Sequence, residues 1–336
     1  MPAAKQVIAM LAGHLDGDSE QVRTIALQIA AAEARQGHLK TAEAMKKLLA
    51  RPLPDRPPTT AKPAGTTLLT KARSELEDLV TVASPRARLS EMTLAAPVRE
   101  RLDRMVRQQT ARGRLREHDL RPGAKLLLVG PPGSGKTLTA SALAGELHLP
   151  LFTIRLEAVI TRFLGESAGK LRMVFDQIAQ MRGVYLFDEF DAIGGKRSAT
   201  NDVGEARRIL NSFLQFLEEP NATDSLIVAA TNHPELLDRA LVRRFDEIIE
   251  YGLPDVDGVR DIVKRRLAGR AGRGLNWARI GEAAQGLSQG EVSRAVEEAL
   301  RESILAERKT VDQAGLTAAL DARRAMREAV ADLFNE

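Results

Sequence analysis

A chain of 336 residues is long enough for one large domain and one or two small ones, since single cores stop growing near ~250–300 residues. The chain has no cysteine, which excludes a thiolate nucleophile, a disulfide framework and a cysteine-ligated zinc site. Its five histidines are scattered, and no segment approaches the ~20 apolar residues of a membrane span. The first residues are not typical of a secretion signal. We therefore expect a cytoplasmic protein with no membrane segment and no structural metal.

The formal net charge is +4, and the basic excess is interleaved with acidic residues over positions 99–121. Mixed charge of this kind is typical of a solvated helix face or a subunit contact, not of a stripe that follows phosphates. Aromatic residues make up only 4% of the chain, which disfavours stacking on bases. The composition thus argues against nucleic acid as a partner.

The N-terminal part is predicted to be a small helical docking domain followed by a linker. Over residues 1–50, apolar side chains such as Leu11, Leu15 and Val22 recur at helical spacing. Residues 51–67 read RPLPDRPPTTAKPAGTT, which is rich in proline and poor in apolar side chains. This composition predicts a semi-rigid linker.

Residues 68–250 are expected to form the large domain. Weakly periodic helices lead from the linker to a buried strand at 125–129. Further short apolar runs occur at 151–154, 184–187, 226–230 and 247–249. Helical stretches separate them, and this alternation predicts an α/β fold with a parallel sheet covered by helices on both faces. Residues 251–336 are predicted to be a small helical domain, with a long helix from about Glu291 to Arg308.

A complete phosphate-binding loop follows the first strand of this domain. The candidate nucleotide-binding residues are Gly130, Pro131, Pro132, Gly133, Ser134, Gly135, Lys136, Thr137 and Leu138, the last opening a helix. The glycines let successive backbone N–H groups point at the β- and γ-phosphates, and the helix N-terminus adds its positive dipole end. Lys136 supplies a charge to the outer phosphates and the Thr137 hydroxyl can ligate Mg²⁺. The loop therefore predicts ATP and Mg²⁺.

Polar side chains also follow two later strands. The run VYLFDE ends in Asp188, a candidate Mg²⁺ ligand, and Glu189, a candidate for orienting and polarising the attacking water. The next strand ends in Asn232, whose amide can hydrogen-bond the γ-phosphate or that water. The alternative for Asn232 is a cap for the turn before Pro234.

The motifs GPPGSGKT, VYLFDEFDAI, TNHPELLD and LVRRFD together resemble the AAA family of ATPases, over roughly residues 90–310. This resemblance implies a P-loop NTPase domain with a C-terminal helical lid and a homo-hexameric ring. The short last motif is similar to that of katanin, spastin and the endosomal-sorting ATPases. It implies that Arg243 and Arg244 reach the neighbouring subunit's nucleotide site. The alternative is a surface ion-pair cluster with Asp238, Asp246 and Glu247.

The segment TRFLGES resembles the family's substrate-gripping pore loop, which makes Phe163, Leu164 and Gly165 candidate substrate contacts. The alternative places Phe163 in the core of an amphipathic helix. In the helical domain the stretch LSQGEV, residues 287–292, lacks the arginine of a Gly-Ala-Arg motif, and Arg294 is a weak substitute.

Two functions from different classes remain. The first is a ring motor that remodels, unfolds or threads a protein substrate, and the second is a nucleic-acid motor or loader. A nucleotide-gated regulatory switch is a third possibility. The N-terminal stretch is similar to bacterial AAA ATPases paired with a subtilisin-like protease in phage defence, which implies a separately encoded protease as partner. No Ser-His-Asp arrangement or HExxH motif is evident, so proteolysis is expected to come from another chain.

Overall fold

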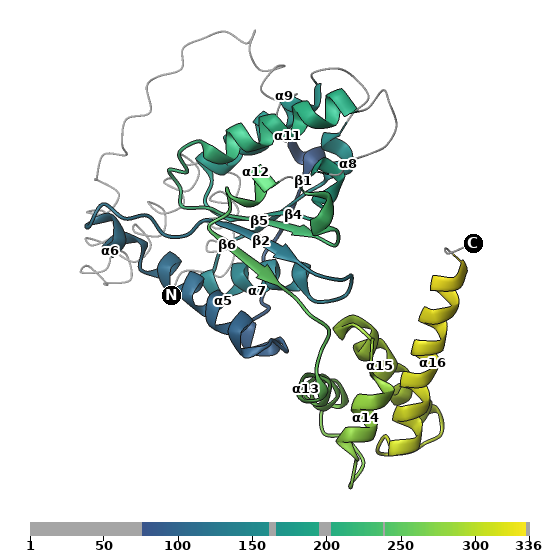
Figure 1. Ribbon diagram of the computed structural model, residues 1–336. Coiled ribbons are helices and arrows are strands. Elements are labelled where there is room, and N and C mark those ends of the chain that lie inside the picture. Colours follow the sequence, from purple (N-terminus) through teal and green to yellow (C-terminus); the bar gives the residue numbers. More distant parts are fainter. Residues whose placement is uncertain (1–75, 161–165, 195–202, 238, 334–336) are drawn as a thin grey trace, which may run out of the picture. The chain divides into compact units, whose positions relative to one another are not determined.

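The computed structural model describes residues 76–160, 166–194, 203–237 and 239–333 (Figure 1). The expected docking domain at 1–50, the linker at 51–67 and the expected substrate contacts Phe163, Leu164 and Gly165 lie outside this part of the chain.

The large domain is built on a six-stranded sheet in the order β1-β3-β4-β5-β2-β6. The strands are β1 (Val80–Ala83), β2 (Lys125–Val129), β3 (Leu151–Ile154), β4 (Val184–Phe187), β5 (Leu226–Thr231) and β6 (Glu247–Glu250). All neighbouring pairs from β3 to β6 are parallel, and β1 is antiparallel to β3. The structure thus confirms the predicted α/β class, and the five predicted strands agree with β2 to β6 to within one residue at each end.

The first strand corrects the expectation that only helices precede β2. Residues 80–83 pair with β3, with Val80 opposite Ile154. The strand has four residues, and Val82 is 59% exposed. This edge strand is short and is apolar on one side only. It therefore has too few alternating apolar and polar positions for the strand pattern to be recognised in the sequence.

Helices cover both faces of the sheet (Figure 1). One face packs on α9 (Glu166–Gln180) and α11 (Val203–Glu218), and the other on α5 (Ala96–Thr110) and α7 (Lys136–Leu147). Successive residues of β4 alternate between the two cores: Tyr185 and Phe187 face the first. Both sides of each central strand are therefore buried, as its continuous apolar sequence predicts.

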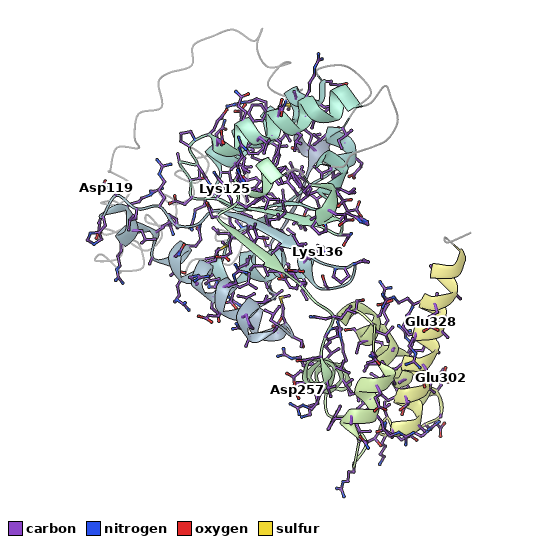
Figure 2. The ribbon with its side chains drawn as sticks, viewed as in Figure 1. Asp119, Lys125, Lys136, Asp257, Glu302 and Glu328 are labelled. Carbon is purple, nitrogen blue, oxygen red and sulfur yellow. The ribbon has the colours of Figure 1, made fainter. Side chains whose placement is uncertain are left out.

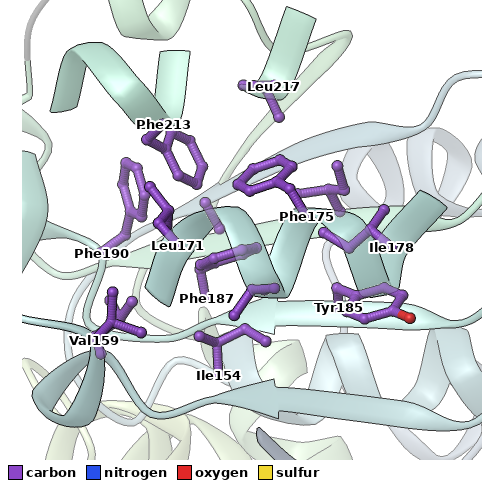
Figure 3. Packing of buried hydrophobic residues seen from close by; sticks show 14 of the residues in the cluster. Ile154, Val159, Leu171, Phe175, Ile178, Tyr185, Phe187, Phe190, Phe213 and Leu217 are labelled. Atoms are coloured by element: carbon purple, nitrogen blue, oxygen red, sulfur yellow. The ribbon is translucent and has the colours of Figure 1, made fainter. Parts of the chain in front are cut away.

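Aromatic side chains dominate the first core (Figure 3). The ring of Phe213, from α11, lies edge-on to Phe187 at 5.2 Å and tilted to Phe190 at 4.7 Å between centroids. Phe213 and Phe187 are both fully buried. This packing fixes α11 over β4 and β5 and so holds the carboxyl ends of those strands in place.

Short elements complete the large domain. They are η1 (Leu89–Glu91), α6 (Arg112–Arg116), α8 (Leu156–Val159), α10 (Asp191–Gly194), η2 (Pro234–Leu236) and α12 (Arg239–Val242). No helix in the described part of the chain is long and apolar enough to span a membrane.

The C-terminal helices form a separate core. They are α13 (Val256–Leu267), α14 (Trp277–Ala283), α15 (Gln289–Leu305) and α16 (Gln313–Leu333). The Ser288 hydroxyl caps α15 by accepting from Glu291 N, and the Glu291 carboxylate accepts from Ser288 N. This capping box starts the helix at Gln289, two positions before the predicted start, and the helix ends at Leu305 instead of Arg308.

Candidate functional site

Three adjacent strands bring the predicted chemical groups to one edge of the sheet. The phosphate-binding loop follows β2, Asp188 and Glu189 follow β4, and Asn232 follows β5. The strands are neighbours in the order β4-β5-β2 and run parallel, so their carboxyl ends meet. Residues up to 96 positions apart, such as Lys136 and Asn232, are thereby brought into contact. This is the edge at which open α/β sheets bind their ligands.

Lys136 lies at the start of α7, inside the loop (Figure 2). Its Nζ donates to Gly130 O at 2.7 Å, Pro131 O at 2.9 Å and Asn232 Oδ1 at 2.8 Å. Burial lowers the pKa of this ammonium group, and the carboxylates of Asp188 and Asp191 oppose the shift. A phosphate oxygen is a stronger acceptor than a carbonyl, so the amine is placed to exchange loop acceptors for phosphate.

The metal-binding candidates are also in contact. Thr137 Oγ1 donates to Asp188 Oδ2 at 2.7 Å, across 51 positions of the sequence. Hydroxyl and carboxylate oxygens suit Mg²⁺, which fills its other positions with water and phosphate oxygens. Among the described residues no group of three or more His, Cys, Asp or Glu side chains forms a metal cage. The pair therefore fits a Mg²⁺ ion that is held together with a nucleotide.

Glu189 is exposed beside Asp188 and has a backbone φ of +51°. Positive φ is uncommon for a residue with a side chain and costs about 1–3 kcal/mol where the surroundings impose it. Here the next residue is fixed, because Phe190 N donates to Ala230 O at 2.8 Å and the Phe190 ring is fully buried. The backbone thus turns Glu189 out of the core at the edge where the phosphate loop lies.

A second network joins the ends of β4 and β5, and the sequence patterns did not reveal it. Thr231 Oγ1 donates to Asp191 Oδ1 at 2.9 Å and accepts from His233 N at 3.0 Å. These bonds fix the turn that carries Asn232. Asp191, the second aspartate of DEFDAI, was the sequence signal for this network, but its partner Thr231 lies 40 positions away.

The lid touches the phosphate loop directly. Gly290 N donates to Gly133 O at 2.8 Å. Gly133 has a φ of +75°, and a Cβ there would stand 2.8 Å from Ser288 Oγ. Glycine is therefore required at this position both by the backbone conformation and by the closeness of the lid.

Arg243 and Arg244 lie just before β6, at the amino edge of the sheet, whereas the loop follows its parallel neighbour β2 at the carboxyl edge. Arg243 is exposed, and Arg244 Nε donates to Glu218 Oε1 at 2.6 Å. The two described acids of the alternative cluster have other partners. Asp246 accepts from the Ala124 and Lys125 backbone, and Glu247 pairs with Arg101 and Arg104. Both arginines thus lie at the sheet edge opposite the phosphate loop of their own chain.

Phe163, Leu164 and Gly165 lie outside the described residues. Arg294 is exposed on α15.

The fold and this edge define a P-loop nucleoside triphosphatase with a helical lid. The model of the ATPase family associated with various cellular activities (AAA) matches residues 126–253. The chain is 32% identical over 310 residues to an uncharacterised AAA family ATPase, y4kL, of Sinorhizobium fredii, covering 92% of each chain. It therefore belongs to the AAA family of ATPases, binds ATP with Mg²⁺ and hydrolyses it.

Further relatives are named ATP-dependent zinc metalloproteases. FtsH 1 of Methylacidiphilum infernorum is 35% identical over 210 residues, which are 59% of this chain and 33% of that protein. FtsH of Haemophilus influenzae is 43% identical over 145 residues, 41% of this chain and 23% of that one. The chain thus spans a third or less of these metalloproteases, and the likeness supports an ATP-driven motor.

Proposed function

We propose that this protein is a ring-forming AAA motor that uses ATP hydrolysis to remodel, unfold or thread a protein substrate. The observation that carries the proposal is the assembly at one sheet edge of the Lys136–Asn232 and Thr137–Asp188 contacts, at 2.8 and 2.7 Å. Together they supply a phosphate-binding amine, a metal-binding pair and a polar amide. Positioning and charge stabilisation of this kind account for nearly all catalysis of phosphoryl transfer.

Each residue of the site has a proposed role. Lys136 binds the outer phosphates, and Thr137 with Asp188 holds Mg²⁺, which neutralises the charge that develops on the phosphates. Glu189 polarises the attacking water. Asn232 links that water or the γ-phosphate to Lys136, whose amine it already contacts.

The position of Arg243 and Arg244 supports the proposed ring. They lie on the sheet edge opposite their own phosphate loop, so they can complete a nucleotide site only on another subunit. We propose that both neutralise charge on the transferred phosphoryl group in trans. The number of subunits, proposed as six, rests on the family resemblance.

The substrate is proposed to be an extended polypeptide held by Phe163, Leu164 and Gly165. An aromatic side chain grips such a chain through contact area, independently of its sequence. The metalloprotease relatives support this choice, since they are named as ATP-dependent proteases. We further propose delivery to, or control of, a separately encoded protease of the subtilisin-like class.

The proposal is tested by comparing how strongly different classes of substrate stimulate the ATPase activity. ATPase activity is measured with a permanently unfolded protein, with single-stranded DNA and with double-stranded DNA. We expect stimulation by the unfolded protein alone, and stimulation by DNA alone would contradict the proposal. The Phe163→Ala variant should keep basal ATPase activity within a few-fold and lose work on the protein. A melting temperature lowered in line with a ~3–5 kcal/mol core truncation would instead place Phe163 in the core.

A further inference from the structure

The sheet edge opposite the phosphate loop carries arginines around one buried aspartate. Lys125, the first residue of β2, marks this edge in Figure 2, and Lys136 marks the loop side. Arg182 stands two residues before β4, and Asp224 stands two residues before β5. The first residues of these two parallel strands are register partners, so Arg182 and Asp224 lie side by side.

The short helix α6 adds two arginines to this cluster. Arg116 Nη2 lies 2.6 Å from Asp224 Oδ2 and donates to Ala222 O at 3.1 Å. Arg112 Nε lies 3.9 Å from the same carboxylate oxygen. The side chain of Asp224 is only 5% exposed, whereas those of Arg112 and Arg116 are 39% and 50% exposed. The carboxylate is therefore buried beneath guanidinium groups that reach the surface.

Arg182 is half-buried, and its charge has no counter-ion in the described part of the chain. Its Nε atom is buried without a hydrogen-bond partner among the described residues, and its Nη2 donates to the neutral Gln109 Oε1 at 3.3 Å. Burial lowers the pKa of this guanidinium, the nearby charge of Arg112 lowers it further, and Asp224 opposes the shift. Three guanidinium groups thus face one carboxylate, which leaves two positive charges in excess.

Hydrogen bonds hold the backbone beside the cluster in place. Gly183 N donates to Ser225 Oγ at 3.2 Å, which ties the residues that lead into β4 and β5. Thr223 Oγ1 donates to Ile178 O at 2.7 Å and so fixes the preceding turn to the end of α9. Guanidinium groups on a fixed backbone lose little conformational freedom when an anion binds.

We propose that Arg112, Arg116 and Arg182 form a binding site for a phosphate dianion at the sheet edge opposite the nucleotide site. Guanidinium groups pair with phosphate through parallel N–H donors, and a dianion matches the two excess positive charges. Inorganic phosphate and the phosphate group of a phosphorylated side chain share this chemistry. The inference goes beyond the proposed motor function, because this second anion site takes no part in ATP hydrolysis.

The test is titration calorimetry of inorganic phosphate with the full chain carrying Glu189→Gln, saturated with Mg²⁺ and ATP so that the nucleotide site is filled. We expect Arg112→Gln and Arg182→Gln each to weaken phosphate binding about fivefold or more, since each removes a charged donor. Asp224→Asn should strengthen it about threefold or more, because the repelling charge is removed. Arg114→Gln, an exposed arginine of the same helix, is the matched control and should change it by less than about twofold.

Two further probes define the ligand. Acetate, a monoanion, should bind about tenfold more weakly than phosphate. A peptide containing phosphoserine distinguishes the two sources of the dianion. If it binds more tightly than inorganic phosphate, the ligand is a phosphorylated protein, and if it binds more weakly, the ligand is free phosphate.

The proposal is overturned if phosphate does not bind, if acetate binds as tightly, or if Arg114→Gln weakens binding as much as Arg112→Gln. An unchanged phosphate affinity in Asp224→Asn would also overturn it, because the arginines would then serve only to neutralise the buried carboxylate. Circular dichroism checks that each variant is folded, and if Arg182→Gln is not, the Arg112 and Asp224 variants decide. None of these outcomes affects ATP turnover, so a failure here is distinct from a failure of the proposed motor.

Discussion

Glu189 combines exposure, a positive φ and a position directly after the metal-binding candidate Asp188. Replacing it by Gln keeps its shape and removes the basic carboxylate. We expect ATP binding to be retained and turnover to fall by ~10²–10⁴-fold, the usual contribution of a general base. The measurement is steady-state phosphate release alongside nucleotide binding.

Glu235 provides the matched control for that variant. It is an exposed acid at the same sheet edge, paired with His233 at 3.0 Å. Because such exposed pairs contribute little, Glu235→Gln should leave turnover within about twofold. Glu189→Gln with more than about a tenth of normal turnover would contradict its assignment as the base.

The residues of the candidate site were predictable because their motifs are local in sequence. The loop from Gly130 to Thr137 and the acids after β4 can each be recognised without knowledge of the fold. The direct contacts between them could not be predicted, since the Lys136–Asn232 and Thr137–Asp188 contacts span 96 and 51 positions. Such contacts depend on strand order, which short-range patterning does not specify.

At the scale of an element, helix α7 packs closely against the backbone of Ala87, in the segment between β1 and η1. A Cβ on Gly145 would stand 2.0 Å from Ala87 O, a backbone atom with little freedom to move. Gly145→Ala should therefore destabilise the protein, by roughly 1–3 kcal/mol as overpacked sites do. Chemical denaturation measures the change in unfolding free energy.

Gly169→Ala in α9 is the control, because nothing lies within 4 Å of its Cβ position. There the ordinary helix preference for Ala should apply, with stability unchanged or raised by up to ~1 kcal/mol. If both substitutions stabilise equally, α7 does not lie against Ala87 as described.

The elements were predictable where burial is complete. Strands β2 to β5 are mostly apolar, with Lys125, Thr153 and Thr231 as the exceptions, and flanking loops mark their limits. Helix ends were less accurate, since α15 starts at a capping box that depends on Ser288 and Glu291 together. The edge strand β1 was missed because only its pairing with β3 makes it a strand.

At the scale of the whole molecule, the two tyrosines of the chain are buried in the cores on opposite faces of the sheet, so their ionisation indicates whether both cores are intact. Burial raises the pKa of Tyr185 well above its usual range and raises that of Tyr251 to about 12, a shift that the Thr139 hydrogen bond opposes. An acid with a raised folded-state pKa binds its proton more tightly when folded. Its stabilising contribution is therefore complete below pH ~10 and is lost as the pH rises toward 12.

This prediction is tested by following tyrosinate absorbance in the ultraviolet as the pH is raised, and by recording the helical circular dichroism signal at the same pH values. We expect no tyrosinate at the usual pKa of 10.0 and its appearance together with loss of helical signal at higher pH. Tyrosinate forming near pH 10 in a fully helical protein would show that at least one ring is accessible.

The proposed ring makes each nucleotide site depend on two chains. Lys136→Ala removes the loop amine but leaves the arginines, and Arg243→Ala with Arg244→Ala does the reverse. Each alone should lose most turnover, since a trans-acting arginine contributes ~10³-fold or more. Mixed, the two should regain activity, because some interfaces then pair an intact loop with intact arginines.

Glu218→Ala separates this role from the ion pair that Arg244 makes within its own chain at 2.6 Å. The pair is partly exposed, so its loss should change stability by ~0–1 kcal/mol and leave turnover largely intact. If Glu218→Ala loses as much activity as Arg244→Ala, the arginine acts by holding α11 in place. Complementation that fails at every mixing ratio and protein concentration, with both variants folded, would contradict the shared site.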